Sequence, residues 1–85
     1  MTIEFTKQAD DDLAFFKKNG NKQIIEKVKQ LLKSISDDPY TGIGKPEPLK
    51  HDLSGAWSRR INREHRLVYE VEEDVVNILS LKGHY

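Results

Sequence analysis

The side chains of this sequence that could do chemistry gather in its middle section. One carboxylate lies there between two prolines, and basic and imidazole groups precede and follow it: Lys45, Glu47, Lys50, His51, Arg59, Arg60 and Arg66. A carboxylate or an imidazole can take up or deliver a proton, and a guanidinium can hold a phosphate through two parallel hydrogen bonds. The two prolines restrict the backbone around Glu47, as a carboxylate held in a fixed position requires.

This set of groups matches the needs of RNA cleavage without a metal. The ribose 2′-hydroxyl must lose a proton, the phosphorane-like transition state gathers negative charge, and the leaving 5′-oxygen must gain a proton. A carboxylate or histidine can be the base, a second titratable group the acid, and an arginine or lysine the electrostatic clamp. Residue types alone are a weak signal, because many small domains contain the same set.

The distribution of charge is more informative than its total. The chain of 85 residues has a formal net charge of 0. Residues 39–69 hold six basic and three acidic residues, a net of +3, whereas residues 70–85 hold one lysine and four acidic residues, a net of −3. Four of the six basic residues are arginines, the side chain best suited to phosphate. The middle section is therefore a candidate anion-binding surface, although charge alone favours an ordinary solvated face.

Several classes of protein are excluded by what the sequence lacks. It contains no cysteine, which excludes disulfides and thiolate metal sites. Its histidines have no metal-ligand spacing and its glycines form no nucleotide-binding loop, so we expect neither a metal nor a cofactor. Without a signal peptide or a membrane-spanning run, the expected location is the cytoplasm, with no membrane contact. A chain of this length predicts one domain, 1–85.

The first half of the sequence predicts a strand followed by two helices. Residues 2–5 alternate polar and apolar side chains, as in a short strand. Thr6 is placed to cap a following helix, whose N-terminal half contains aspartates at residues 10–12, where the helix dipole favours them. Asn21 is placed to cap a second, strongly amphipathic helix that ends at Asp38. The two helices are predicted to pack antiparallel around a tight turn.

The second half predicts a long loop followed by a sheet. Residues 39–56 contain three prolines and three glycines, which predicts a loop. From Trp57 the side chains alternate with a period of two, which predicts strands at residues 57–61, 66–71 and 75–82. The fold class is therefore α+β: a strand, an antiparallel helix hairpin and then an antiparallel sheet meander, with the helices on one face.

Longer stretches of the sequence resemble a known family. They read GKPEPLKH at residues 44–51, LSGAWSRRI at residues 53–61 and EHRLVY at residues 64–69, and the chain ends in His84-Tyr85. This combination resembles the YoeB/Txe family of the RelE-like toxins of bacterial toxin–antitoxin systems. The order of elements agrees over the whole chain, and the section 42–69 is highly specific.

The resemblance implies a microbial-ribonuclease-like fold and an endoribonuclease that cuts messenger RNA on the ribosome without a cofactor. The family's catalytic carboxylate falls on Glu47, the expected general base, and its catalytic arginine falls on Arg66, which would stabilise the charged phosphate. Its C-terminal histidine falls on His84, the expected general acid. Tyr85 would orient the substrate or support the acid.

A second group of residues is expected to bind RNA through its phosphates. Lys50 and Arg60 match family positions that contact phosphate. The other candidates on this surface are Arg59, His51 and Lys45.

The resemblance also implies partners. A toxin of this family is neutralised by an antitoxin of the YefM/Phd type, and a basic active face suits an acidic disordered segment that folds on binding. The ribosome and its messenger RNA are the other expected partners. Self-association into a homodimer stays open, since the sequence does not test it.

Two other functions stay open beside the enzyme. One is a non-catalytic toxin of the same fold, such as one that poisons DNA gyrase by contact, and the other is a plain RNA-binding domain. A gyrase poison would not need a carboxylate, an arginine and a terminal histidine together, so their joint presence favours the enzyme. An RNA-binding domain predicts salt-sensitive binding without cut products.

Overall fold

Two α-helices and five strands follow one another along residues 1–83, which are the residues that the computed structural model describes, apart from the Asp52 side chain. In chain order they are β1 (Thr2–Phe5), α1 (Lys7–Lys18), α2 (Lys22–Asp37), β2 (Glu47–Pro48), the 3₁₀ turn η1 (His51–Leu53), β3 (Ala56–Arg60), β4 (Arg66–Glu72) and β5 (Val75–Ser80). This arrangement confirms the predicted α+β fold class.

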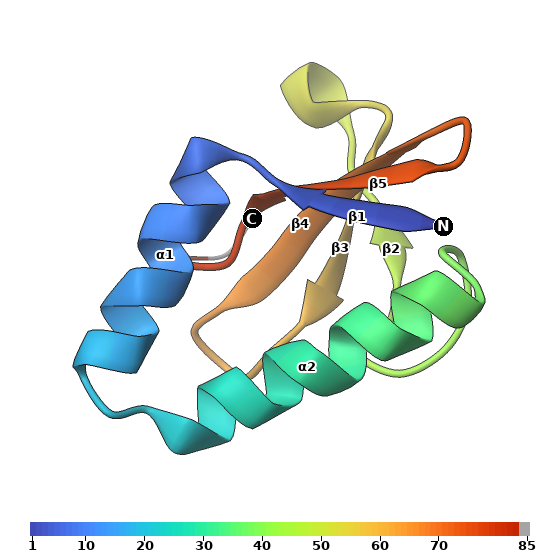
Figure 1. The fold of residues 1–85 in the computed structure, drawn as a ribbon. Helices are drawn as coiled ribbons and strands as arrows, with labels where there is room; N and C mark the ends of the chain where they lie inside the picture. The colour runs from blue at the N-terminus through green and yellow to red at the C-terminus, as the bar shows by residue number, and fades with distance from the viewer. Residues whose placement is uncertain (84–85) are drawn as a thin grey trace.

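The strands form one mixed sheet in the order β1-β5-β4-β3-β2. β3, β4 and β5 make the antiparallel meander that the sequence predicts. β1 joins it in parallel beside β5, with Ile3 opposite Val76 and Phe5 opposite Ile78. A parallel pair needs a long connection, and here that connection contains both helices. The first strand is thus held against the last, as Figure 1 shows in blue and red.

Both helices lie on the same side of the sheet and share one apolar core with it (Figure 1). The buried core side chains come from the two helices, from alternate positions of β4 and β5, and from the residues that directly follow β3 and β5: Ala9, Phe16, Ile24, Val28, Leu31, Ile35, Ile61, Leu67, Tyr69, Val76, Ile78 and Leu81. Trp57 packs half-buried against this core. The helices are thereby fixed on one face, and neither of them covers the face on which the opposite set of strand side chains lies.

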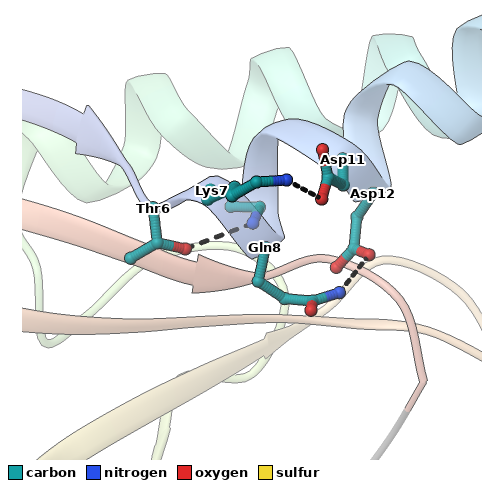
Figure 2. A network of polar contacts seen from close by, with 6 residues as sticks. Thr6, Lys7, Gln8, Asp11 and Asp12 are labelled. Atoms are coloured by element: carbon teal, nitrogen blue, oxygen red, sulfur yellow. Dashed lines mark hydrogen bonds and ion pairs between the residues drawn. The ribbon is translucent and has the colours of Figure 1, made fainter.

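The helix boundaries agree with the sequence, with one difference in how they are capped. The Thr6 hydroxyl accepts a hydrogen bond from the Ala9 N–H at 3.2 Å, which confirms the predicted cap of α1 (Figure 2). Asn21 occupies the cap position of α2, but its side chain makes no capping bond. α2 depends instead on its amphipathic stripe, because burial of an apolar face supplies most of the stability of helices in proteins.

The predicted loop over residues 39–56 contains two short elements that the sequence analysis missed. In β2, Glu47 pairs with Ser58 and Pro48 with Trp57. Proline lacks an N–H and is tolerated in an edge strand, where that donor is not needed. The prolines hide this strand from a pattern-based prediction, and the predicted strand bounds shift slightly too, since β4 extends to Glu72 and β5 ends at Ser80.

Arg59 connects the loop after α2 to the sheet. Its side chain is fully buried, and the Nε, Nη1 and Nη2 atoms of its guanidinium donate five hydrogen bonds. The acceptors are Tyr69 Oη at 3.1 Å, Ser34 Oγ at 2.7 Å, and the carbonyl oxygens of Asp38 at 2.8 Å, Thr41 at 2.8 Å and Ile43 at 3.1 Å. All five donors of the guanidinium are therefore used, so this buried cation is fully hydrogen-bonded.

The loop around Arg59 is closed further by polar and steric contacts. The Tyr69 hydroxyl donates to the Pro39 carbonyl at 2.6 Å, and burial raises the pKa of Tyr69. The Tyr40 N–H donates to the Asp38 carboxylate and holds the pKa of that carboxyl below its usual value. Gly44 has a φ of +83°, and a Cβ there would lie 2.7 Å from Leu31 Cδ2. A side chain would not fit at this point, which explains the glycine.

We predict that Arg59→Lys lowers the free energy of unfolding by about 3 kcal/mol, because a lysine leaves several of the five acceptors without a donor. Arg60→Lys is the matched control: Arg60 is the next residue and is exposed, so its change should stay within about 0.5 kcal/mol. Urea unfolding followed by circular dichroism measures both. Equal stability of the two variants would contradict the structural role of Arg59.

Candidate functional site

The sheet face away from the helices brings together three of the predicted site residues. The register pairs Glu47 of β2 with Ser58 of β3, and Arg60 of β3 with Arg66 of β4. Side chains alternate along a strand, and paired residues point to the same side. Glu47, Ser58, Arg60 and Arg66 therefore share one face, although three separate strands supply them.

Glu47 and Arg66 face one another across β3. The Arg66 Nη1 atom lies 3.9 Å from Glu47 Oε2, and the same nitrogen donates a hydrogen bond of 3.3 Å to the Ser58 hydroxyl. The Arg66 side chain is only 18% exposed, whereas the Glu47 side chain is 58% exposed. A half-exposed carboxylate thus lies beside a guanidinium that its neighbours hold in place, and an incoming polar ligand can reach both.

The C-terminal segment contacts the backbone of Arg66. The Arg66 N–H donates to the Gly83 carbonyl at 2.8 Å, which fixes residue 83 next to the start of β4. The other two predicted catalytic residues, His84 and Tyr85, lie outside the described residues. Their assignment stays a prediction.

Four of the predicted phosphate-binding residues have exposed side chains: Arg60, Lys45, Lys50 and His51. Arg60 shares the face of the pair, and its N–H donates to the carbonyl of Gly44, the residue before Lys45, at 2.7 Å. Lys50 and His51 come after β2, at the start of the η1 turn. Lys45 and His51 have left-handed backbone conformations. Binding of phosphate by these four residues stays a prediction.

One predicted phosphate-binding residue is wrong. Arg59 is fully buried on the helix side, and its five hydrogen bonds leave no donor for a phosphate. The cause is strand alternation: Arg60 faces the open side, so its neighbour must face the core. The acceptors that make burial of Arg59 acceptable come from residues far away in the sequence, and a local pattern does not reveal them.

Sequence reasoning also missed two residues that organise the site. Alternation places Ser58 on the same face as Arg60, but nothing in the sequence joins it to Arg66. Asp12, expected to serve the dipole of α1, is instead 4% exposed, and its carboxylate accepts the Leu81 N–H. His65 has a structural contact, since its ring accepts the Gly83 N–H. Asp12 has the helical spacing of the apolar stripe of α1, and this was the sequence signal for its burial.

The described part of the chain offers no group of three or more histidine, cysteine, aspartate or glutamate side chains placed to hold a metal ion. No helix in residues 1–83 has the length and apolar character that crossing a membrane requires.

Comparisons with known proteins agree with this fold. A family model for the YoeB-like toxin of bacterial type II toxin–antitoxin systems matches residues 5–85. Toxin YoeB of Synechocystis sp. is 48% identical over 85 residues, which cover 100% of this chain and 98% of that protein. The structure of the YoeB/ParE toxin from Agrobacterium tumefaciens has a TM-score of 0.95 at 37% identity, with 100% of each chain covered.

Two structures from Staphylococcus aureus show similar chains in assemblies. A YoeB–YefM complex contains a chain 49% identical to this one, with a TM-score of 0.89, and a YoeB dimer contains one 48% identical, with a TM-score of 0.91. Each comparison covers 100% of this chain and 98% of the other. This chain belongs to the YoeB-like toxin family of bacterial type II toxin–antitoxin systems, which confirms the resemblance drawn from its motifs.

The open face predicts a measurable affinity for a chain of phosphates. We expect Arg60→Ala to weaken binding of a single-stranded oligonucleotide without 2′-hydroxyls, which cannot react, and to lower the slope of log affinity against log salt by about one. Lys29→Ala on α2, on the other side of the sheet, should leave the slope unchanged. Fluorescence anisotropy at several salt concentrations measures both, and identical slopes for Arg60→Ala and the unsubstituted protein would contradict the assignment.

Proposed function

We propose that this toxin is an endoribonuclease that cuts messenger RNA on the ribosome by attack of a ribose 2′-hydroxyl on the adjacent phosphate. The observation that carries the proposal is the pairing of Glu47 and Arg66 at 3.9 Å on the sheet face that neither helix covers, which Arg60 shares. This pair supplies a proton acceptor and a fixed positive charge at one place, which are two of the three requirements of the reaction.

In this mechanism Glu47 takes the proton of the 2′-hydroxyl. The 2′-oxygen then forms a bond to phosphorus while the bond from phosphorus to the 5′-oxygen breaks. The upstream fragment keeps the phosphate as a 2′,3′-cyclic ester, and the 5′-oxygen leaves with a proton. We assign delivery of that proton to His84 and its support to Tyr85, on the strength of the family pattern.

Arg66 has the electrostatic role. Negative charge grows on the phosphate oxygens in the transition state, and a guanidinium that is already oriented stabilises it without reorganising. The bond to Ser58 and the low exposure of Arg66 support such preorganisation. The exposed side chains of Arg60, Lys45, Lys50 and His51 would hold the neighbouring phosphates of the message.

The comparisons support partners of two kinds. The S. aureus relative assembles with YefM and also as a dimer, at close to half sequence identity over the whole chain. We extend both to this toxin: an antitoxin of the YefM type neutralises it, and a homodimer is its second assembly. Ribosomes and messages as substrates place its action in the cytoplasm.

The proposal predicts that Glu47→Gln slows cleavage of a ribosome-bound message by about 10²–10⁴-fold, the usual contribution of a general base. Arg66→Lys, which keeps the charge but loses the forked geometry, should cost about 10²–10³-fold. Single-turnover assays read by primer extension give both rates. Glu72→Gln, an exposed carboxylate at the end of β4, is the matched control and should cut at the unsubstituted rate.

A message with a 2′-deoxyribose at the cut position separates the remaining alternatives. It should bind the toxin–ribosome complex and stay intact. Full-rate cleavage of this message, or full activity of folded Glu47→Gln, would contradict the proposal. Salt-sensitive binding of ordinary messages without any cut would instead identify an RNA-binding module.

A further inference from the structure

The segment after β5 is held in place by side chains outside the Glu47–Arg66 pair. Chain ends usually fray unless something ties them down. Here the Asp12 carboxylate of α1 accepts the Leu81 N–H at 2.9 Å and the Lys82 N–H at 3.2 Å on the same oxygen, Oδ2. The Gly83 N–H donates to His65 Nδ1 at 2.9 Å. Three successive backbone donors are thus received by two side chains.

Each of these two side chains is itself oriented by neighbours. The Gln8 amide donates to the other Asp12 oxygen, Oδ1, at 2.8 Å, so that Oδ2 faces the segment (Figure 2). The His65 ring stacks edge-on against Phe16 at 5.0 Å between centroids. Asp12 is 4% exposed and the His65 side chain 17%. Buried acceptors fixed in this way define where residues 81–83 lie.

The segment after β5 in turn contacts Arg66, the first residue of β4. The Gly83 carbonyl accepts the Arg66 N–H at 2.8 Å, so Gly83 donates to His65 on one side and accepts from Arg66 on the other. Lys82 adds a cation–π contact, with its ammonium 3.9 Å from the centre of the Phe15 ring of α1.

We propose that Asp12 and His65 are positioning residues, which hold residues 81–83 against the backbone of Arg66. The inference rests on the proposed function, because it gives the held segment a part in the reaction. On this proposal, α1 and the turn before β4 supply residues that position the site without taking part in the reaction. A purely structural role for the two residues would affect stability and leave the turnover rate unchanged.

Amide hydrogen exchange of the full-length protein tests the docking without any substrate. In Asp12→Ala and in His65→Ala, we expect the Leu81, Lys82 and Gly83 amides to exchange about tenfold faster or more, while the α2 amides keep their protection. Asp11→Ala is the matched control, since Asp11 is an exposed carboxylate on the same helix that pairs with Lys7 (Figure 2). Unchanged exchange at residues 81–83 in both variants would overturn the docking.

Single-turnover cleavage of a ribosome-bound message tests the catalytic consequence. Misplacement of a reacting group costs up to about 10²-fold, so we expect the maximal rate to fall by roughly tenfold or more while the half-saturating concentration stays the same. His65→Asn should recover most of this loss, because its amide oxygen takes the place of Nδ1 as acceptor, whereas His65→Ala should not. Both lack the ring, so they differ in the acceptor and not in the contact with Phe16.

The outcomes separate this inference from the proposed function. A loosened segment with an unchanged maximal rate overturns the positioning role, and so does equal activity of the asparagine and alanine variants. An inactive unsubstituted protein contradicts the proposed ribonuclease instead, and the exchange data then decide the docking by themselves. If Asp12→Ala fails to fold, the comparison of His65→Asn with His65→Ala tests the inference by itself.

Discussion

A buried arginine on β3 is the constraint on which the candidate site depends. The five donors of Arg59 meet a tyrosine hydroxyl, a serine hydroxyl and three backbone carbonyl oxygens. Burial of a cation costs much less free energy when every donor is paired. Those acceptors belong to α2, to the loop that follows it and to β4, so the guanidinium fixes the path by which the chain enters β2. Glu47 comes from that path, and its place beside Arg66 follows from it.

The strand that carries this structural arginine also presents the functional face. Alternation sends Arg59 toward the helices and Ser58 and Arg60 toward the open side, where Arg66 donates to Ser58. Two adjacent arginines thereby take opposite roles, one in holding the fold and one on the proposed RNA surface. The segment after β5 contacts the start of β4, because its Gly83 carbonyl accepts the Arg66 N–H. The site is thus bordered by two segments that the helix side of the molecule holds in position.

Much of this fold follows from local sequence, and the remainder depends on distant partners. The cap at Thr6 and the periods of the helices and of β3 to β5 are local properties, and they were predictable. β2 was not, since its two residues pair only because Ser58 and Trp57 lie opposite. The burial of Arg59 was missed for the same reason, and so was the part played by Asp12, whose two amide partners lie 69 and 70 residues away. Glu47 and Arg66 could be named from a family motif, but only the register of three strands brings them within 3.9 Å. His84 and Tyr85 rest on that motif alone.

The proposed nucleophile is a ribose 2′-hydroxyl. Glu47 activates it by taking its proton, and Arg66 assists its attack on phosphorus. The chemical nature of the cut ends tests this most directly, because the nucleophile determines which fragment keeps the phosphate. Mass spectrometry of a short message cut in a toxin–ribosome complex should find a 2′,3′-cyclic phosphate on the upstream fragment and a free 5′-hydroxyl on the downstream one. An upstream 3′-hydroxyl with a downstream 5′-phosphate would mean that water attacked the phosphorus, which would contradict a 2′-hydroxyl nucleophile and the role of Glu47 as its base.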